Sequence, residues 1–249
     1  MRLMSKLLTV AIVLGAAGAA SAQTADEIVD KTLTAMGGRA ALGKLTSRSS
    51  VGTMTVSTPA GDIAGSIEVL NQVPNKSRTL ITLDLSAAGA GSMVLDQRFD
   101  GTSGYALDSM RGNHDITGGQ LETMRNNVFP TPFLTYKERG TKLELAGHEK
   151  VGDRDAFLLN VTPQSGPASK VFIDAQSYLP VKFIVTVDLP DIGSVEQTTE
   201  LSDYREVDGV QVPFRLHGAS SVQTFTIVVT KVAHNVTIDE SLFGKPGGK

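Results

Sequence analysis

The sequence predicts a mainly β protein, an incomplete antiparallel β-barrel of about eleven strands closed by an N-terminal helix and a mid-chain helical lid. Three observations support this fold class. Apolar and polar residues alternate over most of the chain from about Ser47 onward. Turn sequences such as Pro190-Asp191-Ile192-Gly193 and Asp208-Gly209 separate the alternating runs at short intervals, which is typical of a meander. Helical spacing of apolar residues is confined to two segments, one near the N-terminus and one in mid-chain.

Residues 1 to 22 have the features of a signal peptide. Arg2 and Lys6 precede an apolar run over residues 7–14, and Ala20-Ser21-Ala22 matches the small-residue pattern at which signal peptidase cuts. We therefore predict cleavage before Gln23 and a periplasmic protein. A retained membrane anchor is the alternative, but a spanning helix needs about 20 consistently apolar residues.

Cleavage would leave 227 residues and change the formal net charge from −3 to −5, because Arg2 and Lys6 are lost. This acidic balance argues against a nucleic-acid partner. A chain of this size can form one large β domain, so we expect residues 23–249 to be a single half-barrel domain. The sequence contains no cysteine, which excludes disulfides, a thiolate nucleophile and a lipid-bearing cysteine after the cleavage site.

The first predicted element of the mature chain is a helix from Thr24 to Met36. Thr24 is the expected N-cap, two acidic residues follow in the first turn, and an apolar stripe runs along one side. Gly37-Gly38 ends the helix, and a short second turn over residues 39–43 leads into the first strand.

The strands are predicted from residue alternation. Clear runs lie at residues 53–57, 66–69, 81–85, 181–187, 195–201 and 210–217. In each run one set of alternating residues is apolar and the other polar, as expected for an antiparallel sheet with one buried face. Crossover helices are not needed to connect them.

A mid-chain helical segment interrupts the alternation between about Thr117 and Arg139. It reads as one helix, or as two short ones broken at Pro130 and Pro132. We expect this segment to close the barrel as a lid. The predicted lid residues are Leu121, Met124, Val128, Phe129 and Phe133.

The inward face of such a sheet must be covered by a second layer or by curling around helices or a ligand. The chain has no Trp and only 5% aromatic residues, so its inward side chains fill space poorly. The functional interpretation is an apolar cavity that binds an acyl chain or another lipid, and the alternative is a closed hydrophobic core. The predicted lining residues are Met54, Val56, Ile67, Val69, Ile81, Leu83, Phe157, Leu159, Phe183, Val185, Phe214, Leu216, Phe225 and Ile227.

Catalytic and metal-binding patterns are not evident. The four histidines, at 114, 148, 217 and 234, lack the close spacing of metal-binding motifs. Gly101-Thr102-Ser103-Gly104 resembles a nucleophile elbow only superficially and reads better as a hairpin turn. Asp100 and Asp208 each precede a glycine and are expected in turns. We therefore predict no enzymatic activity, no metal and no cofactor.

Four segments resemble a known family. They are residues 36–47 (MGGRAALGKLTS), 99–105 (FDGTSGY), 171–181 (VFIDAQSYLPV) and 204–214 (YREVDGVQVPF). Together they are similar to the LolA/LolB-like superfamily of outer-membrane lipoprotein-sorting (lipoprotein carrier) proteins. The resemblance implies an incomplete antiparallel barrel closed by helices, with an apolar cavity for acyl chains. It also implies that residues 23–249 are a single LolA-like half-barrel domain, that residues 121–133 form part of the lid and that the first helix lies across the sheet.

Two functional hypotheses follow. In the first, the protein is a periplasmic carrier that binds a lipid or lipoprotein acyl chain in an apolar cavity and transfers it across the envelope, with a possible delivery partner at the inner or outer membrane. In the second, it is an envelope sensor or interaction module that recognises a protein partner through the same concave sheet.

Overall fold

A computed structural model describes residues 23–189 and 193–247 of the chain. The expected signal peptide, residues 1–22, lies outside this part. Among the described residues, each helix is too short or too polar to span a bilayer.

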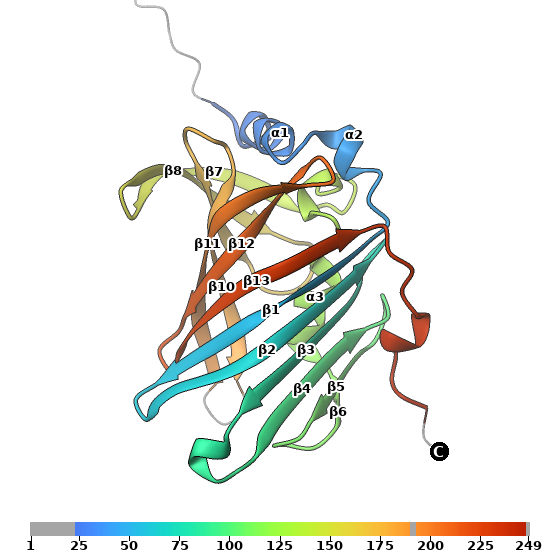
Figure 1. Ribbon diagram of the computed structural model, residues 1–249. Coiled ribbons are helices and arrows are strands. Elements are labelled where there is room, and N and C mark those ends of the chain that lie inside the picture. The colour runs from blue at the N-terminus through green and yellow to red at the C-terminus, as the bar shows by residue number, and fades with distance from the viewer. Residues whose placement is uncertain (1–22, 190–192, 248–249) are drawn as a thin grey trace, which may run out of the picture.

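Thirteen strands in the described residues form one antiparallel sheet (Figure 1). The spatial order is β6-β5-β4-β3-β2-β1-β13-β12-β11-β10-β9-β8-β7. Each strand pairs with strands adjacent to it in the sequence, except that β1 pairs with β13 and thereby joins two meanders, β1–β6 and β7–β13. The strands are β1 (Ser47–Thr58), β2 (Gly61–Gln72), β3 (Lys76–Asp84), β4 (Ser92–Phe99), β5 (Gly104–Asp108), β6 (His114–Ile116), β7 (Lys142–Val151), β8 (Arg154–Thr162), β9 (Ser169–Asp174), β10 (Pro180–Leu189), β11 (Gly193–Val207), β12 (Val210–Ala219) and β13 (Thr224–His234).

The sheet is curled but not closed, since β6 and β7 at its two ends do not pair with each other. The prediction of an incomplete antiparallel barrel with helical elements is thus confirmed. The expected number of about eleven strands was too low. One reason is β6, whose three residues are too short for alternation to be recognised. That residues 23–249 form a single domain stays a prediction.

Helix α1 (Ala25–Ala35) begins as the sequence predicts. The Thr24 side chain accepts a hydrogen bond from the backbone N–H of Glu27, and the Glu27 carboxylate accepts one from the backbone N–H of Thr24, which forms a capping box. Gly37 ends the helix with φ of +120°, and a Cβ there would lie 2.3 Å from the carbonyl oxygen of Gly209. This close approach allows the α1 end, followed by α2 (Arg39–Leu42), to pack on the β11–β12 turn.

The mid-chain segment contains α3 (Gly118–Asn126) and a 3-10 turn, η2 (Pro132–Leu134). In Figure 1, α3 lies behind β1 and β2, on the concave side of the sheet. Two further 3-10 turns are η1 (Ser86–Ala88) and η3 (Glu240–Leu242). The expected helix in mid-chain is confirmed. Helix α3 ends at Asn126, before Pro130, and Pro132 begins η2, where the first turn needs no backbone donor.

The C-terminal segment after β13 runs across the outward side of β2 to β6. Glu240 accepts hydrogen bonds from Gln72 and Lys76, and Lys245 pairs with Asp115 on β6 at 3.0 Å. Phe243, in the same segment, is almost fully buried at 1% exposure. The segment therefore packs against the outward face of the sheet.

Candidate functional site

The strand register places all fourteen predicted lining residues on one face of the sheet. Directly opposite residues of antiparallel strands share a face. Ile67 pairs with Ile81, and Met54 pairs with Ile227, which in turn pairs with Leu216. Alternation along each strand extends this face to the remaining lining positions. Gln97, which is on the same face of β4, lines a pocket together with residues of α3, so α3 lies on this face.

Part of this face is covered by helices. We call this part the helix-covered core. Ile28, Val29 and Leu33 of α1 are each 0% exposed and pack against strand residues from the second meander. Four predicted lining residues lie here: Phe157, Leu159 and Phe214 are buried, and Phe183 is partly buried. These four side chains pack with α1 in one apolar cluster, and their role as a cavity lining stays a prediction.

The rest of the face carries a second apolar group, which we call the distal cluster. It lies toward the hairpin ends of β1 to β4 and β12–β13, away from α1, and none of its members comes from a helix. Met54, Val56, Ile67 and Leu83 are 5–8% exposed, and the others are only partly buried. The members are Met54, Val56, Ile63, Ile67, Val69, Ile81, Leu83, Met93, Phe225 and Ile227.

Eight of the fourteen predicted lining residues belong to the distal cluster. Val185 and Leu216 are in neither group, although Leu216 pairs with Ile227 and Val185 pairs with Gln197. Phe225 owes its position to Gly218, because a Cβ at residue 218 would lie 2.1 Å from the Phe225 ring. The absence of a side chain at Gly218 thus leaves room for the Phe225 ring.

The predicted lid residues do not behave as a unit. Phe129 and Phe133 are buried in the helix-covered core, at 5% and 7% exposure. Leu121, Met124 and Val128 are only partly buried, and α3 has no fully buried residue. The lid therefore has a fixed C-terminal end and a more loosely packed helical end.

Helix α3 is held mainly by polar contacts of its second half. The Arg125 guanidinium donates to the carbonyl of Thr102, and the Asn126 amide donates to the carbonyl of Ser165. The Arg125 carbonyl accepts a hydrogen bond from Arg139. At its other end the helix begins at Gly118, with φ of +60° and no side-chain cap. Such a helix is weakly stabilised on its own.

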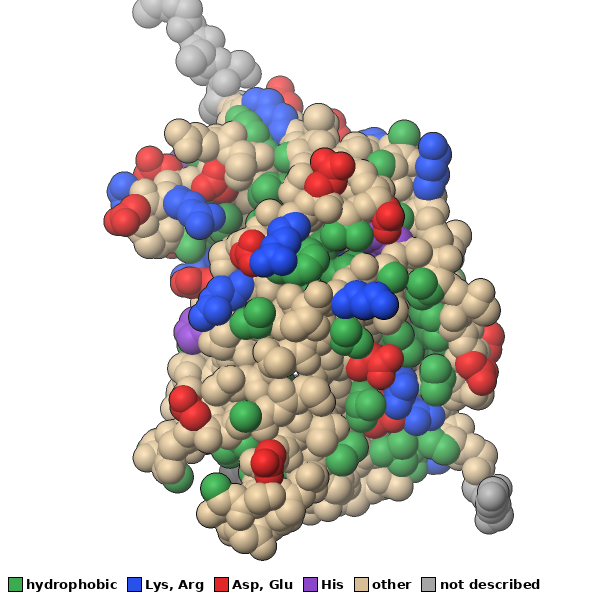
Figure 2. Space-filling model, in the orientation of Figure 1, with side chains coloured by type: hydrophobic (Ala, Val, Ile, Leu, Met, Phe, Trp, Pro, Cys, Tyr) green, Lys and Arg blue, Asp and Glu red, His purple; other side chains and the backbone are tan. Residues whose placement is uncertain are grey.

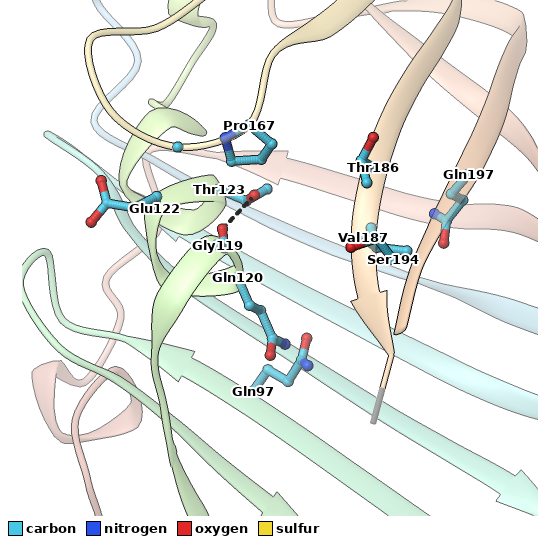
Figure 3. Close-up of a pocket in the computed structure, with 11 residues that line it drawn as sticks. Gln97, Gly119, Gln120, Glu122, Thr123, Pro167, Thr186, Val187, Ser194 and Gln197 are labelled. Carbon is cyan, nitrogen blue, oxygen red and sulfur yellow. Dashed lines mark hydrogen bonds between the residues drawn. The ribbon is translucent and has the colours of Figure 1, made fainter. Parts of the chain in front are cut away.

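A pocket of about 590 Å³ lies between α3 and the sheet (Figure 3). Gln120 extends from α3 toward Gln97 of β4, while Thr186 of β10 and Gln197 of β11 lie across the pocket. The lining is rich in amides and hydroxyls and contains no cation among the described residues. It comprises Gln97, Gly119, Gln120, Glu122, Thr123, Gly166, Pro167, Thr186, Val187, Ser194 and Gln197. Sequence reasoning missed these polar positions, because it searched the inward face for apolar residues only.

An arginine also lies on the inward face. Arg48 is in phase with Met54 on β1, and its guanidinium donates a hydrogen bond to the Asn71 side chain at 3.0 Å. It lies over the ring of Phe129, with 5.5 Å to the ring centroid. Burial lowers the pKa of Arg48 to about 10. Sequence reasoning missed this residue too, although the alternation along β1 could have indicated it.

The outward side carries a different polar arrangement. Asp96 alternates with inward residues on β4 and is paired with Arg78 at 2.8 Å and Arg98 at 2.7 Å. Burial raises the pKa of Asp96, but the hydrogen bonds from Arg78 and Arg98 outweigh it and hold the pKa below its ordinary value. Figure 2 shows one outward view, where apolar side chains occur in small groups among charged side chains of both signs.

The residues considered as catalytic candidates are dispersed. In the ranges that the structure describes, no three His, Asp or Glu side chains are grouped so that they could hold a metal ion. Asp100 accepts hydrogen bonds from the backbone N–H groups of Thr102 and Ser103, as expected for a turn residue. Asp208 lies in the β11–β12 turn with φ of +53°, and its carboxylate contacts His234 at 3.0 Å.

The architecture is similar to that of several solved structures. No family model and no curated protein sequence matches the chain. Among solved structures, a LolA superfamily protein from Nitrosomonas europaea is similar, with 13% identity, a TM-score of 0.57, and coverage of 90% of this chain and 99% of that one.

Two further solved structures show the same likeness. A DUF1329 family protein from Desulfovibrio piger has 12% identity and a TM-score of 0.57, covering 88% of this chain and 97% of that one. An outer membrane lipoprotein-sorting protein domain from Vibrio parahaemolyticus has 12% identity and a TM-score of 0.54, covering 88% and 95%. At such low identity the likeness concerns the fold, and the chain has the fold of the LolA superfamily.

Proposed function

We propose that the protein is a periplasmic carrier that binds a lipid or lipoprotein acyl chain on the inward face of the half-barrel and transfers it across the envelope. The distal cluster carries this proposal. It is an apolar surface on the concave face, six of its ten members are only partly buried, and none of its members comes from a helix. Burial of an acyl chain there would contribute about 0.8 kcal/mol for each methylene.

The lid supports a carrier because its two ends differ in attachment. Phe129 and Phe133 fix the C-terminal end in the helix-covered core, whereas α3 contributes no fully buried side chain. Segments with few buried apolar contacts open at low free-energy cost. Displacement of α3 about the fixed end would widen the pocket of about 590 Å³ beside it and admit a ligand.

The location and the transfer step are also part of the proposal. A basic n-region, an apolar run and an Ala-x-Ala site precede Gln23, which supports export to the periplasm. One solved structure with the same fold is named for outer membrane lipoprotein sorting. A carrier of this kind would exchange its cargo with a delivery partner at the inner or the outer membrane, and it needs no catalytic step or cofactor.

The first test is uptake of a fluorescent fatty acid by the mature protein, residues 23–249. Ile81→Gln places an amide in the distal cluster at a partly buried position and should weaken uptake at least about tenfold. Leu80→Gln, on the opposite face of β3, is the matched control and should bind as the unsubstituted protein does. If both variants bound the fatty acid equally well, the ligand would not lie on the distal cluster.

The second test locks the lid. A Cβ on Gly166 would lie 2.6 Å from the Cβ of Glu122 on α3, so Glu122→Cys with Gly166→Cys can form a disulfide after a small shift. No other thiol is present in the chain. Oxidation should slow uptake and release, and reduction should restore both. The two single variants control for the substitutions, and uptake that is indifferent to oxidation would contradict gating by α3.

The third test identifies the natural cargo. Native mass spectrometry of protein purified from its own envelope should show a bound lipid that organic extraction removes. A ligand-free mass together with one stoichiometric protein partner would instead favour the interaction module that recognises a protein through the concave sheet.

A further inference from the structure

Arg48 is a charged residue on an apolar face, and its surroundings are defined. It occupies the same face of β1 as Met54, and its partners across the neighbouring strands are Asn71 and His234. Asn71 is 6% exposed, and the His234 side chain is 2% exposed. Phe129, from the fixed end of the lid, covers the guanidinium. Arg48 thus lies beneath the lid at the boundary between the helix-covered core and the rest of the inward face.

The Arg48 guanidinium is incompletely satisfied. One nitrogen donates to Asn71, but the Nε atom is buried and has no hydrogen-bond partner among the described residues. Arg48 also has no ion pair with a carboxylate in this part of the chain, whereas Arg78 and Arg98 share Asp96 on the outward side. The carboxylate of Asp208 contacts His234, the neighbour of Arg48 across the strand pair.

A buried guanidinium without a counter-ion is costly for a fold, because desolvation of the charge is not repaid. With a pKa of about 10, Arg48 remains protonated at neutral pH. Protonated arginine presents donors that match the two oxygens of a carboxylate or phosphate. Such an anion would satisfy both the charge and the free Nε donor.

We propose that Arg48 anchors the anionic headgroup, a carboxylate or a phosphate, of the lipid whose acyl chain lies on the distal cluster. This inference rests on the proposed carrier function and adds the charge class of its ligand. Arg48 and Met54 are six positions apart on β1, which corresponds to roughly 20 Å along a strand, comparable to the length of a long acyl chain. The pocket beside α3 has no cation among its described lining residues, so it does not offer the same recognition.

The experiment compares ligands that share a chain and differ in the headgroup. Hexadecanoic acid, its methyl ester and a hexadecanoyl lysophosphatidic acid compete with a fluorescent fatty acid for the mature protein. We expect the unsubstituted protein to bind one of the two anions roughly tenfold or more tightly than the ester. Arg48→Gln should lower the affinity for that anion to that of the ester and leave the ester unaffected.

Arg215→Gln, which alters an exposed arginine on the outward face of β12, is the matched control and should keep the preference for the anion. Preference for the fatty acid would identify a carboxylate ligand, and preference for the lysophosphatidic acid a phosphate ligand. Equal binding of acid, phosphate and ester by the unsubstituted protein would overturn the anchor while leaving the carrier intact. No binding of any of the three would overturn the carrier itself.

A ligand-free readout separates an anchor from a structural arginine. Because the unpaired charge is costly, Arg48→Met should leave the melting temperature of the ligand-free protein unchanged or raise it. An arginine that served only to hold Asn71 and Phe129 in place would instead give a lowered melting temperature and an unchanged ligand preference, and that result would overturn the proposal.

Discussion

The helix-covered core and the distal cluster lie on the same face of one sheet and contain the same kinds of side chain, but they are covered differently. In the first, Ile28, Val29 and Leu33 of α1 are fully buried against the strands. In the second, all members are strand residues, and most remain partly exposed. One sheet therefore carries both a core covered by helices and an apolar cluster to which no helix contributes a residue.

Helices α1 and α3 also differ in how firmly they are attached to the rest of the protein. Helix α1 has a capping box, buries one whole side and contacts the lid through Asp26, which accepts hydrogen bonds from Tyr136 and Lys137 at 2.6 Å each. Helix α3 has no side-chain cap and no fully buried residue. We therefore expect substitutions at α1 to affect stability and substitutions at α3 to affect ligand exchange.

The largest expected effect is on the helix-covered core. Leu33→Ala should lower the free energy of unfolding by about 2–5 kcal/mol, because it leaves a cavity under α1. Ile81→Ala, in the distal cluster, should cost at least about 1 kcal/mol less, since its side chain is only partly buried. Urea denaturation of both variants measures the difference, and equal losses would mean that the distal cluster is sealed as tightly as the core.

A smaller effect is expected at the start of α1. Thr24→Ala removes the side-chain acceptor for the Glu27 N–H and should cost about 1 kcal/mol in urea denaturation. Thr117→Ala is the corresponding change before α3, where no side-chain cap is present, and should be close to neutral. A larger loss at Thr117 than at Thr24 would reverse the proposed order of helix stability.

In α3 itself, Leu121→Ala should lower the unfolding free energy by less than about 1 kcal/mol, because the side chain is only partly buried. Its main effect should be on opening. Hydrogen exchange of the α3 amides should already be faster than that of α1 in the unsubstituted protein, and the substitution should accelerate it further. Exchange in α3 as slow as in α1 would contradict a mobile lid.

The smallest effect concerns acid stability. Hydrogen bonds from Lys137 and Tyr136 lower the pKa of Asp26 below 3.8 in the folded protein. The stabilisation is therefore present above the unfolded-state pKa and is lost as the pH falls through the lowered folded-state value. Since Asp26 and Lys137 are largely exposed, we expect about 0.5 kcal/mol or less. Asp26→Asn should remove this dependence in urea titrations between pH 5 and 3, about the range in which carboxylates titrate; an unchanged acid profile would show that the contact contributes nothing.

Much of the fold was predictable from local patterns. Thr24 and the Gly37-Gly38 pair indicated the limits of α1, and alternation indicated the inward phase of the strands, because both signals depend on near neighbours in the chain. The division of the inward face was not predictable. Phe157 and Ile81 have the same local pattern, and only the tertiary placement of α1 buries one in the core and leaves the other in the distal cluster.

The polar part of the site was missed for a related reason. Gln97 and Gln197 are 100 positions apart, and only the curl of the sheet brings them to one pocket. Arg48 was detectable from its phase with Met54, but its lack of a carboxylate partner depends on contacts with Asn71, Phe129 and His234, which no local pattern encodes.

The pairing of β1 with β13 has a consequence for how the molecule is made. The two strands are separated by most of the chain, so β1 keeps an unpaired edge until the last strand is available. A chain that emerges N-terminus first from a membrane would therefore present that edge for the whole of its passage. The C-terminal segment that packs over β2 to β6 follows β13 in the chain. A chain that lacked β13 would keep the β1 edge unpaired and should be prone to edge-to-edge aggregation.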